Sequence, residues 1–231
     1  MLTHFETVLA EKKLLAGNNI YLFNFKLISP SEIDFLAGQY LMLKVPTVKG
    51  FVSRMYSIAS QPPLKDNFEL IVEIIPHGLA STLLDNLNVG QGASFWGPEG
   101  AFAVKDKEKQ KIILATGTGI APIRSMLKDG MTNYHLFWGL RNYKDVYLFE
   151  ELKPFNPKIC LSREENLETV SEGDRNYFDL GHVDEVMNKL IIDGLTGYEF
   201  YLCGGKATVE SLKQGLLAKN IPQENIHIER F

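Results

Sequence analysis

The tetrapeptide Arg54-Met55-Tyr56-Ser57 carries three side chains that could hold a flavin nucleotide. An arginine can bind a phosphate through two parallel hydrogen bonds. The tyrosine ring offers a flat surface for stacking on another ring, and the serine hydroxyl can donate to a ring nitrogen. The tetrapeptide alone also has a purely structural interpretation, in which it is an edge strand with Arg54 and Ser57 facing solvent and Tyr56 in the core.

Two further segments have the composition of anion-binding turns. Gly78-Leu79-Ala80-Ser81 opens an expected helix, where free backbone N–H groups and the helix dipole favour negative charge; the alternative is that Ser81 is an ordinary N-cap. Thr116-Gly117-Thr118-Gly119 follows an expected strand and precedes an expected helix, so its glycines would let the backbone approach a pyrophosphate. Pro122 fits the first turn of that helix and stands where a GxGxxG fingerprint has its third glycine.

The remaining candidates stand where strands are expected to end. Ser162-Arg163 could clamp the 2′-phosphate of NADP, and the alternative is a surface salt bridge of Arg163. Cys203 precedes two glycines, and Glu229 and Phe231 follow near the chain terminus. Cysteine and phenylalanine commonly fill a core. Ligands of parallel sheets bind at the carboxyl ends of the strands, however, which favours a functional position for Cys203.

Two different sequence patterns must supply the elements that position these residues. Before residue 106, apolar runs bounded by Gly and Pro predict strands at 19–28, 40–45 and 68–75, with a short helix at 80–87, which is typical of an antiparallel barrel or sandwich. After residue 106, strands expected at 111–115, 134–138, 158–162, 199–203 and 226–231 alternate with helices expected at 120–127, 146–152, 183–192 and 208–217. That alternation predicts βαβ units and a parallel sheet. The charged segment 105–111 is interpreted as a solvated surface linker, with a docking patch as the alternative.

The composition argues against several classes of protein. The 231 residues contain 24 Lys plus Arg and 28 Asp plus Glu, and the formal net charge of −4 argues against nucleic acid as the main partner. Two cysteines cannot supply the four ligands of a plant-type iron–sulfur cluster, and five scattered histidines indicate no metal site. The N-terminus lacks a signal-peptide pattern and no apolar run is long enough to span a membrane, so the cytoplasm is the expected compartment.

Taken together and in this order, the motifs resemble the ferredoxin–NADP⁺ reductase superfamily, above all its bacterial flavin-reductase and oxygenase-reductase branch without an iron–sulfur domain. The resemblance extends over nearly the whole chain, from Gly38-Gln39-Tyr40 through Gly97-Pro98-Glu99-Gly100 to the terminal segment 226–231. It implies an N-terminal flavin-binding antiparallel Greek-key β-barrel of residues 1–105. It also implies a C-terminal parallel-sheet α/β domain of residues 106–231 that binds NAD(P)H.

The resemblance further implies a role for each candidate residue. FAD, with FMN as the alternative, would be bound by Arg54, Tyr56, Ser57, Gly78, Ala80 and Ser81. NADPH, with NADH as the alternative, would be bound by Thr116, Gly117, Thr118, Gly119, Ser162 and Arg163. Phe231 would be a further cofactor contact, and Ser57, Cys203 and Glu229 would be the catalytic residues at the reacting rings. The sequence departs from the family pattern at Glu73, where many relatives carry a basic residue, and at His77, where they often have a glycine. It also ends in Phe231, whereas plant-type members end in tyrosine.

The implied function is hydride transfer from NADPH to bound FAD, followed by electron transfer to a carrier protein such as a ferredoxin, a flavodoxin or an oxygenase component. One alternative is a flavin reductase that uses a small acceptor. Another is a flavin-bearing electron-transfer subunit of a larger complex. The expected protein is a monomer with no nucleic-acid or membrane partner.

Overall fold

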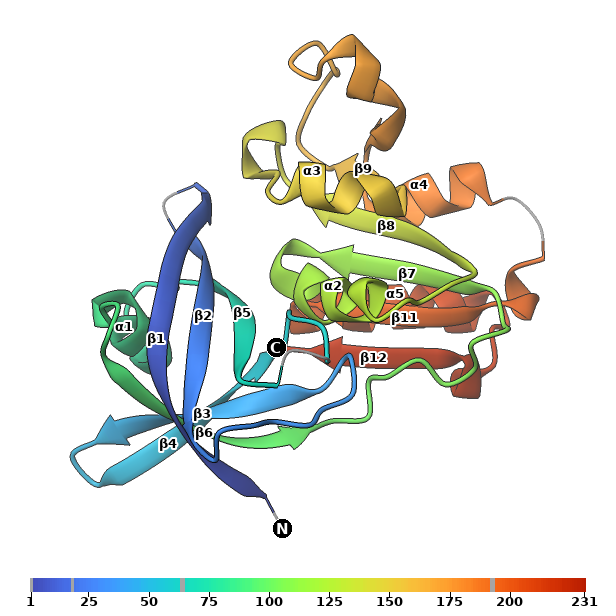
Figure 1. Ribbon diagram of the computed structural model, residues 1–231. Coiled ribbons are helices and arrows are strands. Elements are labelled where there is room, and N and C mark those ends of the chain that lie inside the picture. Colours follow the sequence, from blue (N-terminus) through green and yellow to red (C-terminus); the bar gives the residue numbers. More distant parts are fainter. Residues whose placement is uncertain (1, 18, 63–64, 192–193) are drawn as a thin grey trace. The chain divides into compact units, whose positions relative to one another are not determined.

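A computed structural model describes residues 2–17, 19–62, 65–191 and 194–231 (Figure 1). The chain forms two compact units. The first comprises residues 1–104 together with 121–130, and the second comprises residues 105–120 together with 131–231.

The first unit is a six-stranded antiparallel barrel. Its elements are β1 (Thr3–Ala16), β2 (Ile20–Ser29), β3 (Tyr40–Thr47), β4 (Gly50–Ser57), β5 (Asn67–Glu73), α1 (Leu79–Asn86) and β6 (Gly92–Glu99). The strands lie in the order β4-β3-β6-β1-β2-β5, and each hydrogen-bonded pair is antiparallel. Ile58, directly after β4, bridges to Leu70 of β5 and so joins the two edges of the sheet. The expected antiparallel barrel is confirmed.

Alternation along the strands fills the barrel with aromatic rings. Phe23 and Phe25 of β2 point inward, and Phe25 packs edge-on against Phe95 of β6 with ring centroids 5.0 Å apart. Phe68 of β5 packs against both Phe25 and Phe95. These buried rings bring strands from both halves of the barrel into one core, and edge-to-face pairs are the arrangement that aromatic quadrupoles favour.

Helix α2 (Ile120–Lys128) follows the first strand of the second unit, but residues 121–130 belong to the first unit. Arg124 is buried, forms an ion pair with Glu69 at 2.6 Å and donates to the carbonyl oxygen of Ala59 at 2.8 Å. The Ser125 hydroxyl donates to the carbonyl oxygen of Ser60 at 2.6 Å. Residues 59 and 60 stand two and three positions after Ser57, the last residue of β4, so these bonds hold the helix beside the end of β4.

The second unit is a parallel sheet with helices. Its elements are β7 (Lys111–Thr116), β8 (Tyr134–Leu140), α3 (Phe149–Leu152), β9 (Lys158–Leu161), β10 (Phe178–Leu180), α4 (Val183–Leu190), β11 (Glu199–Gly204), α5 (Lys206–Ala218) and β12 (Ile226–Arg230). All pairs in the order β10-β9-β8-β7-β11-β12 are parallel. The chain runs outward from β7 to β10 and then returns to β11 on the other side of β7. The strand order therefore reverses between β7 and β11, which is where open parallel sheets bind ligands.

The core of the second unit explains why its strands are apolar throughout. Five of the six residues of β7 and all six of β11 are buried, as expected for strands of a parallel sheet. Val183 and Met187 of α4 and Val209 and Leu212 of α5 belong to one buried cluster with residues of the sheet. The expected parallel-sheet domain is confirmed.

Some sequence expectations differ from the structure in detail. Strands β1, β6 and β10 were not among the expected strands. Strand β1 is rich in Lys and Glu, and its alternation is broken by register shifts such as the one between Leu9 and Glu11. The helix expected at 146–152 is wrong in its first half. Leu148 has a left-handed backbone (φ 52°), and the helix comprises only Phe149–Leu152. The helix predicted for 183–192 ends at Leu190, and its last predicted residue lies outside the described residues.

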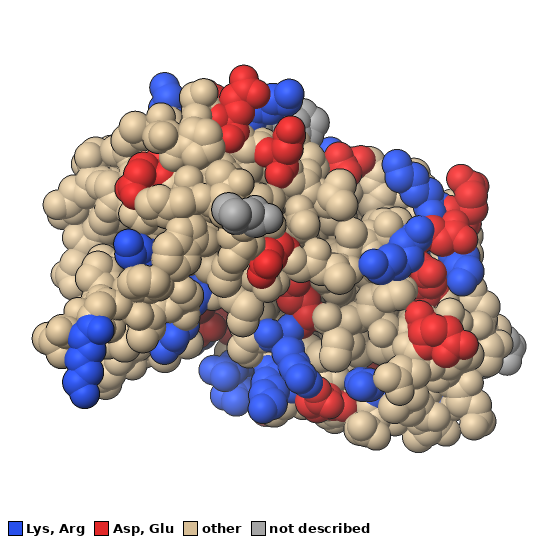
Figure 2. Space-filling model, turned by 90° about the horizontal axis from the view of Figure 1, so that it is seen from below, with Lys and Arg blue, Asp and Glu red and all other residues tan. Residues whose placement is uncertain are grey.

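Charged side chains of both signs are interspersed over the face of the molecule in Figure 2, among a majority of uncharged residues. This mixture agrees with the small net charge of −4 in the sequence. Within the described ranges, no helix is long and apolar enough to cross a membrane, and no three His, Cys, Asp or Glu side chains are grouped as they would be around a metal ion.

The segment 105–111 is not simply a solvated linker, because its last residue is buried. Lys111 begins β7, and its ammonium group donates to the carbonyl oxygens of Lys107 (3.0 Å), Lys109 (2.6 Å) and Thr132 (3.3 Å). Burial lowers the pKa of Lys111, whereas the nearby Glu199 carboxylate opposes that shift. The surface interpretation was wrong at this position, because the side chain closes the loop that precedes the strand.

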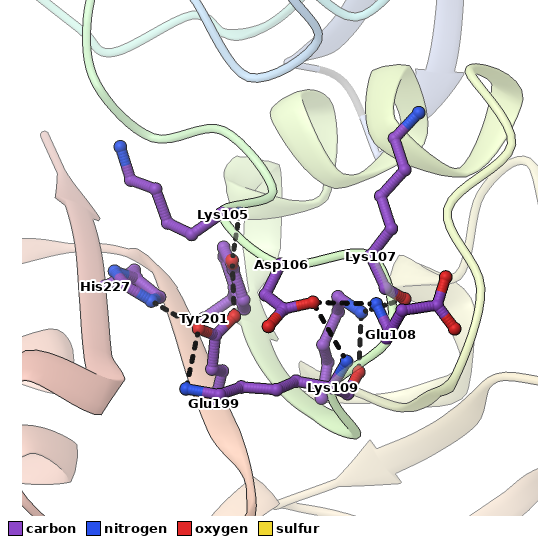
Figure 3. Close-up of polar contacts among 9 residues, drawn as sticks. Lys105, Asp106, Lys107, Glu108, Lys109, Glu199, Tyr201 and His227 are labelled. Atoms are coloured by element: carbon purple, nitrogen blue, oxygen red, sulfur yellow. Dashed lines mark hydrogen bonds and ion pairs between the residues drawn. The ribbon is translucent and has the colours of Figure 1, made fainter.

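The same segment is held by a polar cluster around Glu199, which is buried at the start of β11 (Figure 3). Tyr201 donates its hydroxyl hydrogen to Glu199 at 3.1 Å and accepts the backbone N–H of Lys105 at 3.0 Å. Lys109 Nζ lies 3.6 Å and His227 Nε2 3.9 Å from the same carboxylate. These contacts hold the first residues of the second unit against its sheet.

Candidate functional site

Strand β4 places the proposed flavin-binding side chains by simple alternation. Arg54 and Tyr56 lie on the same face of the strand because side chains two residues apart share a face. Tyr56 is half-buried against the barrel core, and burial raises its pKa to about 12 although the nearby Arg54 guanidinium opposes the shift. The Tyr56 phenol is therefore an uncharged ring at neutral pH. Ser57 lies on the other face of β4 and pairs in register with Tyr40 of β3.

The guanidinium of Arg54 is exposed and available for an anion. Its Nη1 donates to the neighbouring carbonyl oxygen of Ser53 at 2.8 Å. Among the residues that the structure describes, no carboxylate forms an ion pair with it. An exposed arginine with spare donors beside a flat ring is a suitable pair for a phosphate-bearing aromatic cofactor.

The start of α1 offers a second set of donors in the same unit. His77 has a left-handed backbone (φ 62°), and the helix begins after Gly78 without a side-chain cap or an acidic residue in its first turn. The interpretation of Ser81 as an N-cap is wrong, because Ser81 lies in the third helical position and its hydroxyl oxygen accepts the N–H of Ile75 at 2.9 Å. Among the residues that the structure describes, the first N–H groups of α1, including that of Ala80, thus have no side-chain cap and suit an anion.

In the second unit, the turn Thr116–Gly119 stands at the reversal of strand order. Gly117–Gly119 forms one 3₁₀ turn between β7 and α2. A Cβ atom on Gly119 would overlap the carbonyl oxygen of Cys203, and a Cβ on Gly204 would overlap the Thr116 hydroxyl. Glycine at these two positions therefore lets the turn after β7 approach the end of β11 closely.

This turn leaves room for a ligand. Gly117 has φ 54°, and a Cβ atom built on it would meet nothing within 4 Å. The same is true of Gly205, which follows β11. The backbone at these two glycines has no side chain in the way of a ligand. It lies at the carboxyl ends of two parallel strands, next to the start of a helix, and such a position fits a pyrophosphate.

Two arginines lie side by side at the ends of neighbouring strands β8 and β9. Arg163 is exposed, and its backbone N–H donates to the carbonyl oxygen of Arg141 at 2.9 Å. The Ser162 hydroxyl donates to the carbonyl oxygen of Leu140 at 3.3 Å. Within the described part of the chain, neither arginine side chain forms an ion pair. Arg141 was missed in the sequence, although its position just after an expected strand was a usable signal.

Cys203 and Glu229 face each other across β11 and β12. They are paired in register, and burial together with the Glu229 charge raises the pKa of the Cys203 thiol well above its usual value. Cys203 is fully buried and remains a neutral thiol at physiological pH, so its chemistry is that of an uncharged packing group. Phe231 is 55% exposed, and its backbone N–H donates to the carbonyl oxygen of Gly204 at 3.3 Å.

The donor sets of the two units fit two different nucleotides. The first unit groups Arg54 with the Tyr56 ring and provides uncapped N–H groups at α1. The second unit groups the glycine turn with the strand ends that carry Ser162, Cys203 and Glu229. Each arrangement combines phosphate donors with an uncharged surface, as a bound dinucleotide requires.

Comparisons with known proteins agree with this division. The family model described as oxidoreductase FAD-binding domain matches residues 6–104, and the model described as oxidoreductase NAD-binding domain matches residues 113–214. A toluate 1,2-dioxygenase electron transfer component of Pseudomonas putida is 29% identical over 98% of this chain and 67% of its own length. The ferredoxin reductase component of a 3-ketosteroid-9-alpha-monooxygenase of Mycolicibacterium smegmatis is 30% identical over 88% of this chain and 58% of its own length. The chain thus spans about three-fifths to two-thirds of the length of these relatives.

Solved structures share the fold over the whole chain. A cytochrome P450 reductase from Amycolatopsis has a TM-score of 0.85 and 24% identity and covers 100% of this chain and 70% of its own. A ferredoxin NADP⁺ reductase from Neisseria gonorrhoeae with bound FAD and NADP has a TM-score of 0.77 and 20% identity over 99% of this chain and 98% of its own. With one family model on each unit and this shared fold, the chain belongs to the ferredoxin–NADP⁺ reductase superfamily of flavin-dependent oxidoreductases.

Proposed function

We propose that this chain is an NAD(P)H-dependent flavoprotein reductase that passes electrons to a redox carrier protein. The observation that supports this most directly is the glycine turn Thr116–Gly119 at the reversal of strand order, in the same chain as the Arg54–Ser57 strand. The chemistry that bound FAD supplies is acceptance of a hydride and release of electrons. We propose that residues 1–105 hold FAD and residues 106–231 hold the nicotinamide nucleotide.

In the first unit, Arg54 would bind a flavin phosphate and the Tyr56 ring would support the flavin ring. Ser57 would donate a hydrogen bond to the flavin, and Gly78, Ala80 and Ser81 would present backbone donors to the pyrophosphate. The exposed guanidinium and the uncharged phenol support this assignment. FMN could use the first three residues alone, so the uncapped start of α1 favours FAD over FMN.

In the second unit, the turn Thr116–Gly119 would hold the pyrophosphate of the nicotinamide nucleotide. We propose NADPH as the preferred donor, because Ser162, Arg163 and Arg141 bring a hydroxyl and two guanidinium groups without an ion pair among the described residues to where a 2′-phosphate would bind. Cys203 and Glu229 would shape the nicotinamide end of the site, with the Cys203 thiol protonated. Phe231 is exposed, and its ring would be a further cofactor contact.

For the electron acceptor we propose a separate redox protein. Relatives in this part of the family are named as electron transfer components of dioxygenases and as reductase components of monooxygenases. Those relatives are longer than this chain, which spans 67% of the first and 59% of the second. A small acceptor such as free flavin, a quinone or a ferric chelate is the competing outcome.

A flavin spectrum followed by nucleotide titration tests the function. The purified protein is expected to be yellow, and its flavin absorption is expected to bleach without oxygen when NADPH is added, more readily than with NADH. Dye reduction without partners would then identify an enzyme with turnover of its own. A colourless protein that takes up neither FAD nor FMN would contradict the proposal.

We also propose a monomer that works in the cytoplasm. Cys160 and Cys203 are both free and buried, which suits a reducing compartment. Fractionation of cells and sedimentation of the purified protein test these two points.

A further inference from the structure

The carbonyl oxygen of Gly117 accepts an unusual number of hydrogen bonds for a turn residue. The indole Nε1 of Trp138 and the hydroxyl of Tyr147 both donate to it, each at 3.0 Å. The backbone N–H of Ile120 points to the same oxygen and to that of Thr118. Two side chains from separate parts of the second unit therefore converge on one peptide group of the proposed nucleotide turn.

Both donors are rigidly held. Trp138 lies two residues before the end of β8 and is fully buried. Tyr147 lies in the segment before α3 and is almost fully buried. Their rings pack edge-to-face with centroids 4.9 Å apart and planes at 85°. An edge-to-face pair fixes both polar atoms, since neither ring can turn without losing contact with the other.

These bonds select one orientation of the peptide between Gly117 and Thr118. Glycine with a positive φ has wide conformational freedom, so the glycine itself does not determine which way this peptide group faces. In a trans peptide the C=O and the following N–H point in opposite directions. When Trp138 and Tyr147 bind the carbonyl oxygen of Gly117, the Thr118 N–H must face away from them.

The orientation matters because of charge. A carbonyl oxygen directed at a phosphate repels it, whereas an N–H group attracts it. The side of Gly117 where a Cβ would stand is empty, so a ligand can reach the turn. A single peptide rotation would replace a donor by an acceptor at this position.

We propose that Trp138 and Tyr147 are positioning residues that preset the turn Thr116–Gly119 for the pyrophosphate of the nicotinamide nucleotide. This inference rests on the proposed nucleotide site. It assigns to two core aromatics a role in ligand affinity and not only in packing. Because the pyrophosphate is common to both nucleotides, the effect is the same for NADP⁺ and NAD⁺.

The test uses Tyr147→Phe, which removes one donor and keeps the ring. The matched control is Tyr134→Phe, since the Tyr134 hydroxyl donates to the carbonyl oxygen of Phe155 at 3.3 Å in the same unit but away from the turn. Binding of NADP⁺ and of NAD⁺ to the flavin-loaded protein is measured by calorimetry, and stability by urea unfolding. Trp138→Phe is the second test variant.

Tyr147→Phe is expected to lower the binding affinity for NADP⁺ and for NAD⁺ by the same factor, roughly three- to tenfold, which corresponds to one lost hydrogen bond. KM is expected to rise while kcat and flavin content stay unchanged, and Tyr134→Phe is expected to bind as the wild type does. Trp138→Phe should show the same loss of affinity, and unfolding curves identify the fraction that is folded.

Three results would overturn the inference. One is unchanged affinity of Tyr147→Phe when the wild type binds nucleotide, which leaves the proposed function intact. Another is an equal loss of affinity in Tyr134→Phe, which would mean a general effect of stability. The third is a wild-type protein that binds neither nucleotide, which would remove the proposed function as well.

Discussion

At the scale of single residues, we expect the proposed preference for NADPH over NADH to depend on two exposed cations, Arg163 and Arg141. Arg163 and Arg141 are joined through their backbones at the ends of β9 and β8, and within the described residues neither side chain forms an ion pair. A charged hydrogen bond to a phosphate contributes more than a neutral one. The adenosine end of NADH has a hydroxyl in the place of that phosphate.

Replacing Arg163 with alanine is therefore expected to raise the KM for NADPH about 10- to 100-fold and the KM for NADH less than about twofold. Steady-state kinetics with both nucleotides measures the ratio. Lys189→Ala is a charge-matched control, because Lys189 is a surface cation of the same unit that pairs with Asp179. An equal rise for both nucleotides would contradict the assignment of Arg163 to the 2′-phosphate.

We expect His227 to make the stability of the second unit sensitive to acid. Its Nε2 is buried without a hydrogen-bond partner among the described residues, and the Glu199 carboxylate lies 3.9 Å away. Burial lowers the pKa of His227 below its usual 6.5, and Glu199 opposes that shift only in part. As the pH falls through 6.5, the unfolded chain takes up a proton that the folded chain resists, so stability is lost.

The variant His227→Asn lacks this titration. We expect the free energy of unfolding of the wild type to fall more steeply than that of the variant between pH 7.5 and pH 5.5. Urea unfolding at both pH values measures this, and His135→Asn, an exposed histidine of the same unit, serves as control. A wild type that gains stability relative to the variant in acid would mean that attraction to Glu199 outweighs burial.

At the scale of elements, the close approach of the turn after β7 to the end of β11 depends on glycine. A Cβ on Gly119 would overlap backbone atoms of Cys203 and Gly204, which cannot move without disturbing β11. Gly215, in the exposed part of α5, has nothing within 4 Å of such a Cβ. The same substitution should thus have opposite effects at the two positions.

We expect Gly119→Ala to lower the free energy of unfolding by about 1–3 kcal/mol or more and to weaken nucleotide binding. Gly215→Ala is expected to raise the free energy of unfolding by up to about 1 kcal/mol, since alanine is the better helix former. Chemical unfolding and nucleotide titration of both variants measure the difference. A stable Gly119→Ala protein with normal nucleotide affinity would refute the close approach.

Helices and strands with a clear pattern of apolar residues could be predicted from the sequence. Contacts that leave no such pattern were missed. Five of the six parallel strands were evident because strands such as β7 and β11 are apolar throughout, whereas the three-residue strand β10 was missed. Strand β1 was missed because its many charged residues hide its alternation. The burial of Lys111 had no signal at all, because its three acceptors are backbone carbonyls that only the folded loop brings together.

The candidate site shows the same limit. The glycines and Arg163 could be placed because they follow strands directly. The bonds from Trp138 and Tyr147 to Gly117 join residues 21 and 30 positions apart, and side chain to backbone bonds of this kind leave no periodic trace. The assignment of residues 121–130 to the first unit was hidden for the same reason, since it depends on Arg124 and Ser125.

At the scale of the whole molecule, each unit has its own buried core and its own proposed ligand. The aromatic cluster of the barrel and the cluster beneath α4 and α5 share no residue. A ligand stabilises the structure that binds it by mass action, and at 100 times its dissociation constant it slows an opening that releases it about 100-fold. FAD and NADP⁺ should therefore protect different parts of the chain.

Hydrogen exchange with and without each ligand tests this directly. Removal of FAD is expected to speed exchange in β4 and at the start of α1, and addition of NADP⁺ is expected to slow exchange at residues 116–120 and around Ser162, because amides that bind phosphate are protected only while it is bound. The strand β2, which carries none of the proposed contacts, is the internal reference. Protection of residues 116–120 by FAD alone, in the absence of nucleotide, would contradict the assignment of one ligand to each unit.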